Sequence, residues 1–251
     1  MISPPSRPAP RLVFLPGLAC DARIWRSQLD ALAALAHPVE ATVSDAHTRH
    51  DRIEAMAAAV LSEHDGALVL CGASMGGMVA MEAARQAPER VAGLALLGTN
   101  PRPETPEMFR LRESAIGMFE RGDARELIEF NSVFAFHPAQ AADKALLRRY
   151  VELVLDAGVD QLVRQNRAVM HRPDARRHLG ALRCPVLVLC GDGDRLTAPD
   201  CSQEIADLVP QAELHFLPQC GHMLTMEKPA LVNTALLDWL GRLDGLRRPS
   251  P

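Results

Sequence analysis

The stretch Ala67-Leu-Val-Leu-Cys-Gly-Ala-Ser-Met-Gly-Gly77 places a serine directly after a short apolar run and directly before a segment with helical periodicity. The run at 67–71 is rich in Leu and Val and too short for an ordinary helix, so it predicts a buried strand. Apolar residues then recur at helical spacing over 75–86, and Pro88 ends the segment. Strand, Gly-x-Ser-x-Gly and helix in this order are typical of a nucleophile elbow, in which a strained turn exposes the serine hydroxyl. Ser74 is therefore the candidate nucleophile.

The glycines on either side of Ser74 fit this interpretation. A Cβ at Gly72 or Gly76 would crowd a turn whose central residue is held in an unfavourable backbone conformation. The alternative is a turn rich in Gly and Ser that carries no chemistry. The pentapeptide is short, so the rest of the chain has to decide between the two.

Length and composition limit the class of protein. A chain of 251 residues can form one large domain, or a domain with an insertion, and needs no disulfides to hold its core. A net charge of −4 and 4% aromatic residues argue against a nucleic-acid partner. We see no apolar leader and no run of about 18 apolar residues, which predicts no membrane partner. The six cysteines show no metal-binding spacing, so we expect a cytoplasmic protein without a metal.

Short apolar strands alternate with helical segments on both sides of the serine. This rhythm predicts a mostly parallel sheet of about six strands that is covered by helices on both faces. The expected strands are 11–16, 39–43, 67–71, 91–97, 185–190 and 212–217. The expected helices are 24–35, 51–63 (with Asp51 as its cap), 75–86, 200–208 and 227–243.

Residues 102–182 interrupt this alternation. They contain no convincing strand, and helical patterns cover 106–120, 123–130, 139–155 and 159–170. Because the block begins where a strand ends, at the edge where ligands bind in such sheets, we predict a helical cap over the site. The core then consists of residues 1–101 and 183–251. The alternative is a helical layer packed on the edge of the sheet.

A serine hydroxyl needs a base within hydrogen-bond reach and a carboxylate that orients the base. His222 follows the strand at 212–217, in a loop that can face Ser74. The other eight histidines, His47 among them, lie on expected helices, in polar loops or in the wrong strand register, so we expect them to be exposed. Asp192 and Asp194 both follow the strand at 185–190, and spacing alone leaves the choice between them open.

Three motifs in this order resemble the α/β-hydrolase superfamily. They are the elbow at 72–77, the strand and acidic loop at 185–199, and Gly221-His222 followed by Glu227-Lys-Pro229. The similarity extends over about residues 11–100 and 183–243. It implies an α/β-hydrolase fold, with Asp194 as the acid of a Ser74–Asp194–His222 triad. It also implies that the first one or two antiparallel strands of the family are missing here.

The resemblance also indicates where an oxyanion would bind. By the family pattern, the two donors are the backbone N–H groups of Leu18 and Met75. This chain has Pro16 where the family often has His, but the hole needs backbone donors rather than that side chain. The alternative for Leu18 is an ordinary turn residue. No cofactor and no metal are implied.

The expected activity is hydrolysis of a carboxylic ester or lactone of small or medium size through an acyl-enzyme. Met223 and Leu224 are expected to line an apolar wall for this substrate. If a cap arginine faces the site, an enol-lactonase acting on an anionic substrate becomes the alternative, and a C–C hydrolase of diketones is another. A third alternative, from a different class, is a non-catalytic ligand-binding protein on this scaffold. The sequence leaves open whether the chain forms a homodimer.

Overall fold

The computed structural model describes residues 9–37, 39–140 and 142–243. Within these ranges it contains one six-stranded sheet in the order β2-β1-β3-β4-β5-β6, and all five strand pairings are parallel. The predicted parallel sheet is therefore confirmed. The strands are β1 (Arg11–Leu15), β2 (Ala41–Val43), β3 (Leu68–Ala73), β4 (Val91–Leu97), β5 (Val186–Gly191) and β6 (Ala212–Leu217).

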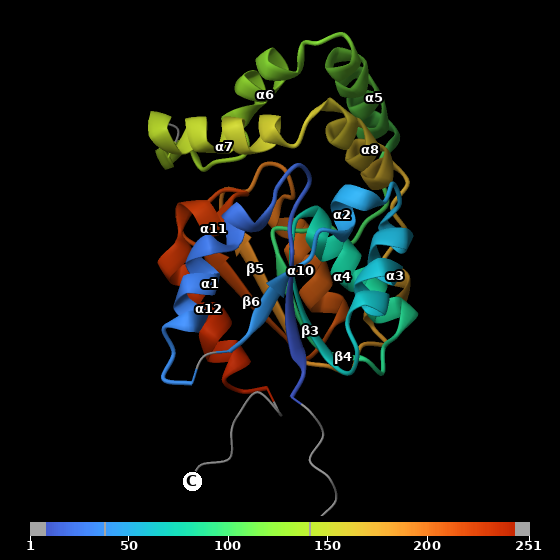
Figure 1. Ribbon diagram of the computed structural model, residues 1–251, viewed down its shortest axis with the longest axis vertical. Coiled ribbons are helices and arrows are strands. Elements are labelled where there is room, and N and C mark those ends of the chain that lie inside the picture. The colour runs from blue at the N-terminus through green and yellow to red at the C-terminus, as the bar shows by residue number, and fades with distance from the viewer. Residues whose placement is uncertain (1–8, 38, 141, 244–251) are drawn as a thin grey trace, which may run out of the picture.

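Alternate residues of the strands build two separate cores, one on each face of the sheet. In β1, Val13 and Leu15 belong to the core on one face, while Leu12 and Phe14 belong to the core on the other. This alternation follows from the two-residue period of a strand. Both faces are apolar because helices cover both, with α3, α4 and α10 over one and α1 and α12 over the other (Figure 1).

The helices that cover the sheet follow the strands closely in the chain. Their bounds are α1 (Arg26–Ala33), α2 (Ala46–Arg49), α3 (Ile53–Glu63), α4 (Met75–Gln86), α9 (Arg176–Leu179), α10 (Pro199–Leu208), α11 (Leu224–Glu227) and α12 (Pro229–Leu240). A 3-10 turn, η1 (Ala22–Trp25), precedes α1. In the described ranges, no helix combines the length and the apolar character that crossing a membrane requires.

The block between β4 and β5 is helical. It contains α5 (Pro106–Glu120), α6 (Ala124–Ser132), the 3-10 turn η2 (Pro138–Gln140), α7 (Lys144–Asp156) and α8 (Val159–Met170). Helices α5 to α8 lie together beyond one end of the sheet (Figure 1). They share a third apolar cluster, which includes Ala19 of the loop after β1 and packs against Leu18 of the same loop. The division at 102–182 stays a prediction.

Several predicted helices end or break where the sequence pattern does not show it. Residues 24–35 begin as the 3-10 turn η1, and residues 227–243 divide at Lys228 into α11 and α12. Asp51 was expected to cap the helix at 51–63, but this is wrong. The helix begins at Ile53 after Arg52, with no side-chain hydrogen bond at its cap.

Candidate active site

Ser74 lies on a sharp turn between β3 and α4. Its φ of 51° and ψ of −116° fall outside the regions that ordinary residues favour. The Thr99 hydroxyl, in the loop after β4, donates a hydrogen bond of 2.7 Å to the Ser74 carbonyl. The backbones around the turn approach so closely that only glycine fits on either side of it. A Cβ on Gly72 would collide with the backbone at Gly76, and a Cβ on Gly76 with the carbonyl of Leu15.

This close packing gives a prediction for Gly76→Ala. The new methyl group meets the backbone of β1, which cannot move aside as a flexible side chain can, so we expect a loss of about 3 kcal/mol or more in the free energy of unfolding. Urea denaturation measures it. Gly180→Ala is the matched control, because a Cβ there lies 3.5 Å from the nearest atom, the Leu208 carbonyl oxygen, at ordinary contact distance. Equal stability of the two variants would contradict the prediction.

The structure brings Ser74, His222 and Asp194 together from three separate loops. His222 Nε2 lies 3.0 Å from Ser74 Oγ, and His222 Nδ1 lies 2.9 Å from Asp194 Oδ2. The imidazole is 7% exposed and the carboxylate is fully buried. Because an ionised carboxylate can only accept, Nδ1 carries the proton and Nε2 is free to accept from the serine hydroxyl.

The loop after β5 holds Asp194 in one orientation. The backbone N–H groups of Leu196 (2.8 Å) and Thr197 (2.9 Å) donate to Oδ1, and the Thr197 hydroxyl donates to Oδ2 at 2.9 Å. Burial opposes ionisation, but the charge of His222 and these hydrogen bonds outweigh it and lower the pKa of Asp194 below its ordinary value. Asp192, the other candidate, is exposed and accepts from the backbone N–H of Cys220 instead.

The pKa of His222, the partner of Asp194, is shifted in the opposite direction. Burial by itself would lower the pKa of His222, but the charge of Asp194, the hydrogen bond to it and the charge of Glu227 raise the pKa above the ordinary value. The imidazole is therefore a stronger base than a free histidine. This is the direction that suits a group that takes a proton from serine near neutral pH.

The loop that carries His222 is tied to the helical block and to α11. The Ala135 carbonyl accepts from the backbone N–H groups of His222 (3.0 Å) and Met223 (3.1 Å). The Glu227 carboxylate accepts from the N–H of Gly221 (3.0 Å) and of His137 (2.9 Å). Glu227 belongs to the motif at 227–229, but the sequence alone gives it no role. Ala135 contributes a backbone carbonyl, which no side-chain pattern reveals.

The two predicted oxyanion donors lie in loops that adjoin Ser74. Met75 is the first residue of α4, so its N–H has no acceptor within the helix. Leu18 lies in the loop after β1. A Cβ on Gly17 of that loop would lie 3.4 Å from Ser74 Cβ, which shows how close the loop runs to the serine. Among the described residues, neither N–H group donates a hydrogen bond.

The predicted apolar wall is buried in the core. Met223 is 7% exposed and Leu224 is 2% exposed, and both belong to the cluster that packs under α1 and α12. Leu224 reaches Gly98, where a Cβ would lie 3.1 Å from its Cδ1. Contact of these two side chains with a substrate stays a prediction.

Two arginines of the helical block form a buried ion-pair cluster with Glu104. Arg172, expected like the other arginines on a solvated face, is 4% exposed at its side chain and pairs with Glu104 at 2.9 Å. Arg112 pairs with the same carboxylate at 2.7 Å. Both guanidinium groups are thus held by Glu104, and one carboxylate against two arginines leaves the cluster with one net positive charge. Eight others of this block are exposed: Arg110, Arg121, Arg125, Arg148, Arg149, Arg167, Arg176 and Arg177.

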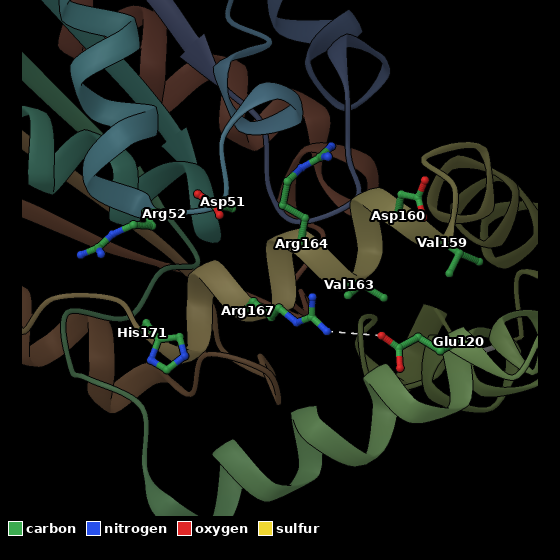
Figure 2. A pocket seen from close by; sticks show the side chains of 9 residues that line it. All are labelled: Asp51, Arg52, Glu120, Val159, Asp160, Val163, Arg164, Arg167 and His171. Carbon is green, nitrogen blue, oxygen red and sulfur yellow. Dashed lines mark hydrogen bonds and ion pairs between the residues drawn. The ribbon is translucent and has the colours of Figure 1, made fainter.

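A hollow of about 950 Å³, which no triad residue lines, lies between α8, the end of α5 and the segment before α3 (Figure 2). Arg167 and Glu120 form an ion pair of 3.3 Å across it. Acidic and basic side chains are mixed in the lining, which gives it no single charge preference. The lining residues are Asp51, Arg52, Glu120, Val159, Asp160, Val163, Arg164, Arg167 and His171.

The described ranges contain no group of three or more His, Cys, Asp or Glu side chains placed to hold a metal ion. Burial raises the pKa of the Cys20 thiol to about 12, so it stays protonated near neutral pH. The Cys220 pKa is also raised by burial.

The chain is similar to known proteins over most of its length. The model of the alpha/beta hydrolase family matches residues 12–235. The chain is 28% identical over 242 residues to the putative carbamate hydrolase RutD of Variovorax paradoxus, with 90% of each chain covered. It is 30% identical over 241 residues to the pimeloyl-[acyl-carrier protein] methyl ester esterase of Aromatoleum aromaticum, covering 88% of this chain and 94% of the relative. A thermophilic esterase from Thermogutta terrifontis has a similar structure, with a TM-score of 0.79, 27% identity and coverage of 94% and 90%.

The chain belongs to the alpha/beta hydrolase family, and it is a hydrolase. The resemblance inferred from the three motifs is thereby confirmed, together with the α/β-hydrolase fold class.

Proposed function

We propose that this protein cleaves a carboxylic ester or lactone of small or medium size, with Ser74 as nucleophile, His222 as base and Asp194 as the orienting acid. The observation that carries the proposal is the hydrogen-bonded chain from Ser74 Oγ through His222 to Asp194, which begins at a strained, glycine-flanked turn. Nucleophile, base and orienting acid in this geometry define acyl transfer to serine.

The reaction proceeds in two halves. Ser74 Oγ attacks the carbonyl carbon while its proton passes to His222 Nε2, and Asp194 stabilises the imidazolium that forms. The tetrahedral intermediate collapses, the C–O bond to the leaving group breaks, and His222 returns the proton to the departing alcohol. Water then gives a proton to His222 and attacks the acyl-enzyme, which forms a second tetrahedral intermediate. This intermediate collapses, the bond between the acyl carbon and Ser74 Oγ breaks, and His222 returns the proton to Oγ as the acid leaves.

The oxyanion of each tetrahedral intermediate is assigned to the N–H groups of Leu18 and Met75. Each such donor contributes about 10²–10³ in rate in enzymes of this kind. The position of Met75 at the start of α4 adds the positive end of a helix dipole to the hydrogen bond.

The names of the relatives support an ester substrate and add one alternative. The Aromatoleum relative is named a methyl ester esterase and the Thermogutta structure is of an esterase. The Variovorax relative is named a putative carbamate hydrolase, and the same nucleophile can attack a carbamoyl carbon. A carbamate is therefore the second candidate substrate.

A panel of substrates tests the proposal. It contains p-nitrophenyl esters of increasing acyl length, γ- and δ-lactones, a phenyl carbamate and a diketone, and a serine-directed fluorophosphonate is applied in parallel. We expect turnover of esters or lactones and covalent labelling at Ser74. Folded protein that is neither labelled nor active on any member would contradict a serine hydrolase and favour a ligand-binding protein.

The raised pKa of His222 predicts the pH dependence of the rate. A protonated imidazole cannot accept the proton of Ser74, so kcat/KM for a neutral ester should fall as the pH drops through the His222 pKa. Because Asp194 raises that pKa, the midpoint should lie above 6.5, the ordinary value for histidine. A profile from about pH 5 to 9 measures it. A midpoint below 6.5 would contradict the assignment of His222 as the base coupled to Asp194.

A further inference from the structure

A buried glutamine on α8 connects the helical block to the loop after β1. Gln165 is fully buried, and its Oε1 accepts a hydrogen bond of 2.6 Å from the backbone N–H of Ala19. Its Nε2 donates to the His47 carbonyl at 2.9 Å. A buried amide with both ends satisfied has one favourable orientation, because losing either partner leaves a polar group unpaired.

Other backbone groups of the loop after β1 also form hydrogen bonds. The Cys20 N–H donates to the Gly17 carbonyl at 3.1 Å, and the Cys20 carbonyl lies 2.8 Å from His47 Nε2. Burial lowers the pKa of His47, so the imidazole is neutral near pH 7 and Nε2 donates its single proton to that carbonyl. Two N–H groups of the loop, those of Ala19 and Cys20, are thereby committed. The N–H of Leu18 has no acceptor among the described residues and stays available.

Ala19 explains why the loop needs this support. Its φ is 54°, in the left-handed region that residues with a Cβ rarely adopt. Such a conformation persists where the surroundings hold it in place. The hydrogen bond from the Ala19 N–H to Gln165 acts at that residue, one peptide unit from the Leu18 N–H.

We propose that Gln165 is a positioning residue for the oxyanion hole. It holds Ala19 in the left-handed conformation and thereby keeps the Leu18 N–H directed at the carbonyl oxygen above Ser74. This inference rests on the proposed function, since it assumes that Leu18 binds an oxyanion. It implies that α8 supports the loop after β1 through Gln165, and that losing this contact would slow the chemical step.

Gln165→Met tests the inference, because Met is close to Gln in length but has no amide, and its thioether sulfur is only a weak acceptor for the Ala19 N–H. We expect kcat for a p-nitrophenyl ester to fall by about 10- to 100-fold, because the Leu18 donor is displaced rather than removed. KM should change by less than about threefold. Gln165→Asn, which keeps the amide but is one methylene too short to reach both partners, should lower kcat in the same direction, and it decides the question where the Met variant does not fold.

The binding of an aryl trifluoromethyl ketone separates positioning from stability. The ketone forms a tetrahedral adduct with Ser74, and the adduct places an oxyanion in the hole. Its affinity should fall by the same factor as kcat, whereas competitive inhibition by the product alcohol, which places no oxyanion in the hole, should stay unchanged. Asn166→Leu is the matched control. Asn166 is the next residue of α8, is 6% exposed, and hydrogen-bonds to Arg112 and the Leu162 carbonyl, away from the loop. It should lower the melting temperature but leave kcat within about threefold of the wild type.

The outcomes distinguish this inference from the proposed function. An active wild type with folded Gln165 variants of unchanged kcat and ketone affinity overturns the positioning role and leaves the esterase proposal intact. Equal losses of kcat in Gln165→Met and Asn166→Leu also overturn it, because the effect is then general destabilisation. A wild type without turnover or labelling at Ser74 removes the proposed function and the positioning role with it.

Discussion

Replacing Ser74 with alanine is expected to lower kcat for ester hydrolysis by about 10⁵- to 10⁶-fold. The variant loses the atom that forms the acyl-enzyme, and neither His222 nor Asp194 can take over that bond. Residual catalysis would come from the oxyanion donors acting on direct attack by water. The fold should remain, because alanine removes one atom from a half-buried position and the Ser74 carbonyl still accepts from Thr99.

The measurement is the rate with p-nitrophenyl acetate, with labelling by the fluorophosphonate as a second readout. Ser132→Ala is the matched control, since Ser132 is also buried but its hydroxyl donates to the Glu129 carbonyl within α6. It should keep the wild-type rate. Turnover by Ser74→Ala above about 1% of the wild type would mean that another group is the nucleophile.

The elbow could be predicted in detail because its constraints are local. The strand before Ser74 and the helix after it show different apolar periods, and α4 spans Met75–Gln86 as the pattern indicated. The two glycines are required by backbone contacts within a few residues of the turn or with the adjacent strand β1. The position of His222 near Ser74 could also be predicted, since a loop at the carboxyl end of a parallel strand lies at the same edge of the sheet as the elbow.

The choice between Asp192 and Asp194 could not be made from spacing. Both residues lie in one short loop, and the direction of each side chain depends on how the loop contacts the segment before His222. The Gly193 N–H donates to the Cys220 carbonyl, while Asp192 accepts from the Cys220 N–H. These contacts turn Asp192 toward the backbone of the histidine loop and leave Asp194 facing the imidazole.

The residues that support the site could not be predicted from the sequence, for a different reason. Gln165 contacts Ala19 from 146 positions away, and its partners are backbone groups, which have no signature in the sequence. His47 was expected to be exposed. This expectation is wrong, because the residue is buried, with 5% of its surface exposed. A short helix, α2, places it under the loop after β1, where its ring donates to Cys20. Nothing in the local pattern indicates that this histidine is covered.

Asp194→Asn is expected to lower kcat by about 10⁴-fold with little change in fold. The reason lies in the hydrogen bonds that the loop after β5 makes to this side chain. Two backbone N–H groups, of Leu196 and Thr197, donate to Oδ1, so the oxygen of an asparagine must occupy that position. Its NH₂ group then stands where Oδ2 faces His222 Nδ1. This NH₂ group can only donate, so Nδ1 has to accept and the imidazole proton moves to Nε2. With a proton on Nε2, the imidazole cannot take the proton of Ser74.

Asp192→Asn is the matched control, with the same change of charge two residues away. Its oxygen can still accept from the Cys220 N–H, so we expect kcat to stay within about threefold of the wild type. The pH profile gives a second test, because removing the Asp194 charge removes the main influence that raises the His222 pKa, and the acid limb of the residual activity should move to lower pH. A larger loss in Asp192→Asn than in Asp194→Asn would reassign the acid. Equal and small losses in both would mean that His222 acts without a carboxylate partner, and the hydrogen bond of 2.9 Å would then serve the fold rather than the reaction.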